Sequence, residues 1–441
     1  MKKYITYFIL FFIMTGALFY RLEHMRNTPI PYPIRSDAKQ YVHYALNLIQ
    51  YGTLNKNYTP NQKPSPDSFR TPGYPFFLAS VIKVVGLQKF YNATRWIQAF
   101  LGTITVLLTF CVARLFMPRW ASLLASLFVA LSPHLISAEN YILTETLFSF
   151  FLLVSVYLFC QAGKTESIPL YALSGLFFGY TYLVTPTIFF IPWIFAIMVL
   201  AKTGMSNKKV FIGMVLFCTL FSIILGGYAL RNHVNVTKKE QSRLLIALCA
   251  GIYPDFIYKS KTYQYYPYKE DPEVESCVSS FKDFSSFFRK RAQQDPLKYF
   301  SWYFWGKPRA LWSWNILQGA GDVYIYEPTI TLYNTSAPAR FLHKFMKLSH
   351  PVILFLFFAG IIIHLAQLIM KKTSVEICVS MIMALLLYYT FIFMALFPLP
   401  RYTIPLRPEL YIFAAWTLQN IFKIILTRGT KKPASVDLSA N

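Results

Sequence analysis

Runs of about 20 apolar residues recur along the chain, and short polar or basic segments separate most of them. A helix of this length crosses a hydrocarbon core of about 30 Å. The pattern therefore predicts an all-α polytopic membrane protein with about ten transmembrane helices. The predicted spans are residues 5–22, 95–116, 120–137, 142–160, 168–184, 187–202, 210–229, 350–370, 375–397 and 403–426.

Basic residues occur in every short connection on one side of these spans. The connections are RLFMPRW, QAGKTES, KTGMSNKK and MKKTS, followed by the tail segment TRGTKKP. Because cytoplasmic loops carry an excess of Lys and Arg, we expect Met1 and Asn441 to be cytoplasmic. The first apolar run lacks a small-residue cleavage site and is followed by Arg21, so we interpret it as a retained anchor.

One shorter apolar run, residues 73–87, contains Lys83 and is short for a spanning helix. Counting it as a span would place the basic connections outside, so we expect a helix on the outer surface. The resulting segments are a first transmembrane helix (1–22), a first outer loop with amphipathic helices (23–94), transmembrane helices 2–7 (95–229), a second outer loop (230–349), transmembrane helices 8–10 (350–427) and a cytoplasmic tail (428–441).

The second outer loop interleaves aromatic with basic residues in FKDFSSFFRKRAQQDPLKYFSWYFWGKPRALWSW. This composition is typical of an interfacial belt, and Pro296 and Pro308 are expected to break it into short helices. Cys249 and Cys277 share this loop. They either form a disulfide, if the loop faces an oxidising compartment, or remain free thiols.

Composition supports a membrane protein and excludes an ordinary soluble domain. Hydrophobic residues make up 55% of the chain, and its mean hydropathy is +0.40. There are 43 Lys and Arg against 19 Asp and Glu, which gives a net charge of +24. The seven histidines show no metal-type spacing, and no nucleic-acid partner is expected.

Ionisable residues gather on the predicted outer side, where charged groups near the membrane mark functional sites. They are Asp37, Arg70, Glu139, Glu145, Arg231 and Arg401. All but Glu145, which apolar residues surround, also have a structural interpretation: Ser36 and Asp37 favour a helix start, Glu139 suits a solvated turn, and the arginines suit interfacial anchors. Ala38, Tyr41, Val42, Ala45, Leu48 and Ile49 would form one apolar face of the helix that Asp37 begins.

The order of several short motifs resembles one family of membrane enzymes. An Asp follows the first span, and FRTPGYPFFLA, LTETLFSF, ALRN and RYTIPLRPEL come after it in this order. The pattern resembles the GT-C superfamily of glycosyltransferases, and in particular the bacterial relatives of protein mannosyltransferases and the lipid A aminoarabinose transferase. The resemblance covers the chain from Met1 to about Thr427.

The resemblance implies roles for these residues. Asp37 matches the catalytic carboxylate of the first outer loop, and Glu145 matches a second acid at the start of a later span. Arg70, Arg231 and Arg401 match basic residues that hold the donor phosphate, and Glu139, Tyr74 and Tyr402 are further candidates. The family often has two adjacent acids in the first loop, but here Ala38 follows Asp37. This departure counts against a metal-bridged or paired-carboxylate site, although a divalent metal stays open as a cofactor.

The expected function is transfer of a hexose or pentose from a polyprenyl-phosphate donor to a lipid, glycan or protein acceptor. Arginine can bind phosphate bidentately, and a carboxylate can take the proton of the acceptor, so Asp37 would be the base of an inverting single displacement. We expect a bacterial inner membrane protein that contacts membrane lipids, with its site on the periplasmic, outer face. The alternative is a transporter or flippase of a lipid-linked or small anionic substrate, without group transfer.

Overall fold

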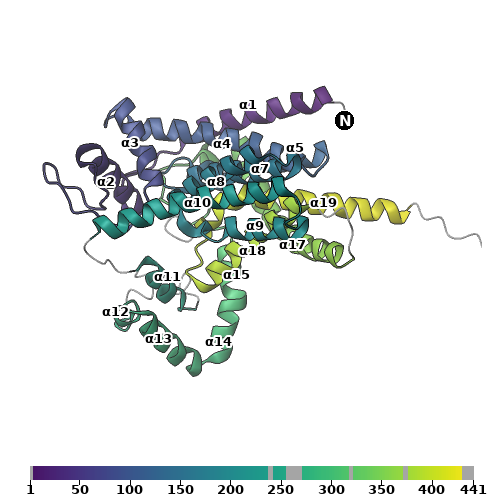
Figure 1. Ribbon diagram of the computed structural model, residues 1–441. Helices are drawn as coiled ribbons and strands as arrows, with labels where there is room; N and C mark the ends of the chain where they lie inside the picture. Colours follow the sequence, from purple (N-terminus) through teal and green to yellow (C-terminus); the bar gives the residue numbers. More distant parts are fainter. Residues whose placement is uncertain (1–2, 237–241, 255–270, 317–320, 371–375, 430–441) are drawn as a thin grey trace, which may run out of the picture.

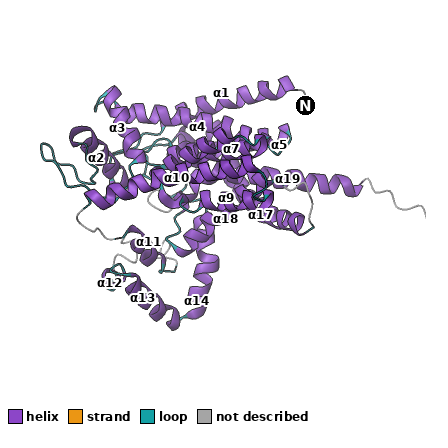
Figure 2. Ribbon diagram, in the orientation of Figure 1, coloured by secondary structure: helices purple, strands orange, loops and turns teal. Residues whose placement is uncertain are grey.

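The computed structural model describes residues 3–236, 242–254, 271–316, 321–370 and 376–429, and the described residues contain helices but no strand (Figure 1). Figure 2 shows the helices and the loops that join them. The first half contains α1 (Lys3–Asn27), α2 (Ser36–Tyr51), α3 (Gly73–Val85), α4 (Phe90–Arg114), α5 (Arg119–Leu131), α6 (Pro133–Ala138), α7 (Glu145–Thr165), α8 (Ile168–Val184), η1 (Pro186–Ile188), α9 (Ile191–Thr203) and α10 (Lys208–Asn235). The second half contains α11 (Arg243–Gly251), α12 (Val274–Cys277), α13 (Phe281–Gln294), α14 (Pro296–Ser301), η3 (Trp302–Gly306), α15 (Lys307–Leu311), α16 (Leu332–Thr335), α17 (Ala337–Ile369), α18 (Ile377–Ala395), η4 (Pro400–Leu406) and α19 (Arg407–Gly429).

The predicted fold class, an all-α membrane protein, is confirmed. In the described part of the chain, seven helical segments are long and apolar enough to cross a membrane: α1, α4, α7, η1 with α9, α10, α17 and α18. The predicted span 120–137 is instead divided, because α5 ends at Leu131 and Pro133 begins α6. The apolar helix α8 has only 17 residues. The last predicted span corresponds to α19, which carries Arg407 and Glu409 in its first turn.

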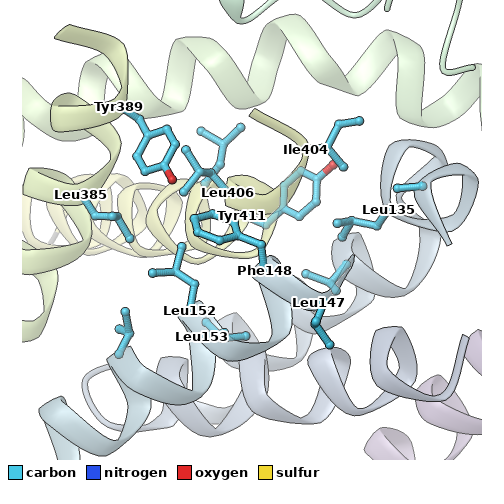
Figure 3. Close-up of a cluster of buried hydrophobic side chains, with 14 of the residues drawn as sticks. Leu135, Leu147, Phe148, Leu152, Leu153, Leu385, Tyr389, Ile404, Leu406 and Tyr411 are labelled. Atoms are coloured by element: carbon cyan, nitrogen blue, oxygen red, sulfur yellow. The ribbon is translucent and has the colours of Figure 1, made fainter. Parts of the chain in front are cut away.

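The core is built around α7, which packs between α4 and α8. Side chains from α6, α7, α18, η4 and α19 meet in one apolar cluster, shown in Figure 3. Close packing depends on small residues: a Cβ added at Gly175 of α8 would lie 2.5 Å from the Phe217 carbonyl oxygen of α10. Glycine lets these two helices approach backbone to backbone, as is common in membrane bundles.

Residues 23–94, the predicted first outer loop, contain the helices α2 and α3. The apolar face of α2, which includes Ala38, Tyr41 and Ala45, is buried against the protein. Gly52 ends α2 in the left-handed conformation at φ +63°, which glycine adopts without a Cβ penalty. The run 73–87 forms α3, and this helix packs against α2, α4 and α8. The loop is therefore a packed part of the molecule that holds the residues following α2 in place.

The predicted second outer loop supplies most of a second, smaller apolar core, which Phe397 and Leu399 complete. A disulfide joins Cys249 of α11 to Cys277 of α12, with Cα atoms 6.1 Å apart. The expected break at Pro296 is present, but the prediction of a break at Pro308 was wrong. The helix continues from α14 through α15 because a π-helical turn, Trp302–Gly306, precedes Pro308. A wider turn changes the hydrogen-bond register where proline lacks an N–H group.

Candidate active site

Asp37 binds two arginines from distant parts of the sequence. Its Oδ1 atom lies 2.5 Å from Arg70 Nη2, and its Oδ2 atom lies 2.8 Å from Arg401 Nη2. Asp37 belongs to the first turn of α2, Arg70 lies just before α3, and Arg401 lies in η4. Both carboxylate oxygens of Asp37 therefore face a guanidinium group.

Arg401 also binds Glu145, the first residue of α7. Arg401 Nε lies 3.1 Å from Glu145 Oε1, so the four residues form a continuous chain in the order Arg70, Asp37, Arg401 and Glu145. The side chain of Glu145 is 6% exposed, whereas that of Asp37 is 30% exposed. The chain of ion pairs, called the ion-pair chain below, thus reaches the surface at Asp37 and the interior at Glu145.

The helix α2 also holds Arg70 in place. Gln40 accepts hydrogen bonds from Arg70 Nε at 2.8 Å and from Nη2 at 2.6 Å, and the Tyr41 hydroxyl lies 3.2 Å from Nη1. The guanidinium also lies 4.9 Å from the centre of the Tyr41 ring. Since Asp37 and Gln40 are three residues apart, they share one face of α2. Gln40 was not among the predicted site residues, although this spacing would have indicated it.

The start of α2 does not have the expected capping arrangement. Ser36 is the first helical residue with φ +46°, the preceding Arg35 occupies the cap position, and no side chain caps the helix. A left-handed backbone is unfavourable for serine by about 1–2 kcal/mol, and such strain concentrates at functional sites. The Asp37 carboxylate is engaged by arginines and not by backbone N–H groups of its own helix.

The arginines set the charge of Asp37. Burial opposes ionisation of this carboxyl, but Arg401 and Arg70 outweigh it and hold the pKa of Asp37 well below its usual range. A carboxylate with so low a pKa is a poor proton acceptor until a guanidinium group moves away. In this arrangement the Asp37 carboxyl is therefore ionised and paired with both arginines.

A further cation, Arg243 at the start of α11, lies beside the ion-pair chain. Arg243 Nη1 donates to the Phe69 carbonyl oxygen at 3.2 Å, and its guanidinium lies 5.1 Å from the Phe69 ring centre. Arg70 approaches the same ring at 5.5 Å. Burial lowers the pKa of Arg243, the nearby Arg70 charge lowers it further, and the Asp37 charge opposes this shift. Sequence reasoning missed Arg243, because nothing in the pattern links α11 to the first outer loop.

Arg231 lies outside the ion-pair chain. Its Nη1 donates to the Asp67 carbonyl oxygen at 2.5 Å, and its Nη2 to the Leu54 carbonyl oxygen at 3.4 Å. These contacts tie the end of α10 to the backbone of the first outer loop. Arg231 therefore supports the loop that carries Arg70.

The remaining candidates, Tyr74, Tyr402 and Glu139, lie near the ion-pair chain. Tyr74 is buried and donates to Gln98 at 3.0 Å, and Tyr402 stacks on Phe393 with ring centres 4.8 Å apart. Glu139 was expected as a solvated turn residue, and this was wrong: it is buried and bound to Arg21 at 2.9 Å. Burial is possible there because Arg21 supplies the opposite charge.

The described residues contain no group of three or more His, Cys, Asp or Glu side chains that could hold a metal ion. Asp37 and Glu145 share Arg401 instead of converging on a common point. Positive charge next to the candidate base is therefore supplied by arginine in this arrangement.

Comparison with known proteins places this geometry in context. Residues 67–225 match the family model of dolichyl-phosphate-mannose-protein mannosyltransferase. No curated protein matches the chain at a significant level.

Among solved structures, the oligosaccharyltransferase of Archaeoglobus fulgidus tethered with an acceptor peptide gives a TM-score of 0.55 at 13% identity, covering 97% of this chain and 51% of the other. The A. fulgidus oligosaccharyltransferase AglB, in complex with an inhibitory peptide and a dolichol-phosphate, gives 0.51 at 13% identity, with 97% and 52% covered. ArnT from Cupriavidus metallidurans bound to undecaprenyl phosphate gives 0.38 at 11% identity, with 98% and 82% covered. The chain spans about half the length of the archaeal enzymes. Over 97% of its length, its helices are arranged as in these archaeal oligosaccharyltransferases, whose fold it shares.

Proposed function

We propose that the protein transfers a sugar from a polyprenyl-phosphate donor to an acceptor at the outer face of the membrane. The observation that carries this proposal is the ion-pair chain, in which Asp37 lies between Arg70 and Arg401. It combines a carboxylate with two planar cations at a partly open position. The fold supports the same class of reaction, since AglB was solved with a dolichol-phosphate.

The donor phosphate would bind the arginines. Arg70 and Arg401 present guanidinium groups that match phosphate oxygens, and Arg243 adds a third cation beside them. The bond between sugar C1 and the phosphate oxygen breaks, and its electron pair stays on the phosphate. Arginine stabilises the charge that develops on this leaving group.

Asp37 would act as the general base. The acceptor attacks C1 from the face opposite the phosphate and gives its proton to the Asp37 carboxylate, with inversion at C1. When the phosphate competes for Arg70 and Arg401, the cause of the low Asp37 pKa is weakened, and the carboxylate becomes a better base. Donor binding would thus activate the base before the acceptor reacts.

The outer face is the proposed location of the site. Cys249 of the Cys249–Cys277 disulfide lies in α11, whose first residue, Arg243, contacts the same Phe69 ring as Arg70, and disulfides persist in oxidising compartments. The basic short connections favour the opposite side as cytoplasmic. A bacterial inner membrane with a periplasmic site fits both observations.

The test uses the purified full chain in lipid nanodiscs with a radiolabelled polyprenyl-phosphate hexose or pentose. We expect release of free polyprenyl phosphate by the wild type, with slow hydrolysis where water replaces the acceptor. Asp37→Asn and Arg401→Ala should abolish this release, whereas Asp295→Asn, a matched change at the exposed start of α14, should not. Movement of intact donor across the bilayer without its consumption would favour a transporter and contradict the proposal.

A further inference from the structure

A second buried ion pair lies close to Glu145, at the interior end of the ion-pair chain. Arg21 of α1 binds Glu139 at 2.9 Å, with side-chain exposures of 0% and 5%. Arg21 also donates to the Ala130 carbonyl oxygen at 3.2 Å. A Cβ added at Gly102 of α4 would lie 1.9 Å from Glu139 Oε1, so α4 has a glycine where this carboxylate packs. The Arg21–Glu139 pair therefore packs tightly where α1, α4 and the end of α6 meet.

A small cavity lies between this pair and Glu145. Its volume is about 10 Å³, and both acids line it. Arg21, Gly102, Thr146 and Ser149 also line it. Of the groups on α7, the Glu145 Oε2, Thr146 Oγ1 and Ser149 Oγ atoms are buried without a hydrogen-bond partner among the described residues. Three polar atoms on one helix thus lack a hydrogen-bond partner among the described residues.

The size and chemistry of the cavity suit one water molecule. A cavity of roughly 10–15 Å³ is the minimum for a water, and a buried water needs two to four polar partners. Here a water can donate to the carboxylates of Glu145 and Glu139 and accept from the hydroxyls of Thr146 and Ser149. A buried carboxylate oxygen without a partner is costly, so this occupant is strongly favoured.

We propose that the cavity binds a single water that joins the Arg21–Glu139 pair to Glu145 and holds Glu145 where it orients Arg401. This inference rests on the proposed function, in which Arg401 binds the donor phosphate. Glu145 uses Oε1 for Arg401 Nε, and the water secures Oε2 on the other side. Thr146 and Ser149 are then positioning residues, because they act on the donor only through Glu145 and Arg401.

The inference makes a specific kinetic prediction. Loss of the water loosens Glu145 and then Arg401, so donor binding weakens, while Asp37 keeps its ion pair with Arg70. Ser149→Ala and Thr146→Val remove the hydroxyls with little change in volume. We expect the combined variant to raise the donor KM about tenfold, with kcat changed by no more than about twofold.

The matched control is Ser155→Ala, which also removes one buried hydroxyl from α7. Ser155 Oγ donates to the Phe151 carbonyl oxygen at 2.7 Å and lies outside the cavity lining. Its donor KM should equal that of the wild type. An unchanged KM in the combined variant, or an equal increase in Ser155→Ala, would overturn the positioning role.

Direct observation separates this inference from the proposed function. A cryo-electron microscopy map of the wild type at a resolution that shows waters should contain one density peak in contact with Glu145 and Glu139. The combined variant should lack this peak. If the wild type transfers no sugar, the proposed function fails, yet the peak still decides the water site: its presence supports the site and its absence refutes it.

Discussion

Arg401 Nη2 lies 2.8 Å from Asp37 Oδ2, although the two residues are 364 positions apart in the sequence. Through its Nε, the same guanidinium also binds Glu145 at 3.1 Å. One arginine from the last quarter of the chain thus connects the first outer loop to the start of α7. The candidate site depends on this connection.

Replacing Asp37 with Asn should remove the proton acceptor and leave the side-chain size unchanged. We expect turnover to fall by about 10²–10⁴-fold, the usual effect of losing a general base. The measurement is release of polyprenyl phosphate, alongside the yield of folded protein. Near-normal turnover would exclude Asp37 as the base. Asp295→Asn is the control, since Asn caps a helix about as well as Asp.

Replacing Arg401 with Lys should impair donor binding although the charge is kept. A lysine amine is a single point charge and cannot hold Asp37 and Glu145 from two edges as the guanidinium does. We expect the donor KM to rise at least about tenfold, the effect of losing one charge-assisted hydrogen bond. Arg289→Lys, at an exposed position of α13, should behave as the wild type. An unchanged donor KM would remove Arg401 from the phosphate site.

Replacing Arg243 with Ala tests the cation that sequence reasoning missed. Its position beside Phe69 and Arg70 suggests that it attracts the anionic donor more than it orients it. We expect a several-fold higher donor KM whose difference from the wild type shrinks as salt increases, since screening weakens an exposed charge. Kinetics at low and high ionic strength provide the measurement. Equal salt dependence in both proteins would contradict this role.

The buried Lys307 should make stability depend on pH. Its Nζ donates to the Ala395 and Leu396 carbonyl oxygens at 3.2 and 3.0 Å, and burial lowers its pKa to about 6. Between about pH 6 and the usual lysine value near 10.4, the unfolded chain binds one proton more than the folded chain. Stability should therefore rise with pH across this window.

The comparison for Lys307 is the melting temperature of wild type and Lys307→Met between pH 6 and pH 9. In Lys307→Met, the melting temperature should rise less steeply with pH, because the contribution of this residue is gone. Lys298→Met, at an exposed position of α14, should keep the pH dependence of the wild type. Parallel curves for wild type and Lys307→Met would show that Lys307 is protonated in the folded protein.

Topology is open to a direct labelling test. The exposed residues Lys63 and Lys208 lie in segments predicted to face opposite sides of the membrane. With a membrane-impermeant maleimide on intact cells, Lys63→Cys should react, and Lys208→Cys should react only after lysis. Labelling of both from the same side would refute the predicted topology and the shared outer site.

Much of the fold follows from the sequence because a membrane requires long apolar helices. The runs that form α1, α4 and α10 could be recognised by length alone, and the amphipathic pattern of residues 36–51 predicted α2. The order of the short motifs also selected Asp37, Arg70, Glu145 and Arg401. These features are local, so hydropathy and residue type reveal them.

Only the tertiary structure decided which charged groups meet. Glu139 and Glu145 are six positions apart, yet one binds Arg21 and the other binds Arg401. Arg231 resembled Arg401 as an outer-face cation, but its partners are backbone carbonyls of the first outer loop. A charged side chain buried in a helical bundle must find its partner through packing, and the sequence contains no distance between helices. The sequence therefore determined the helices and the kinds of reactive groups, while helix packing determined their pairing.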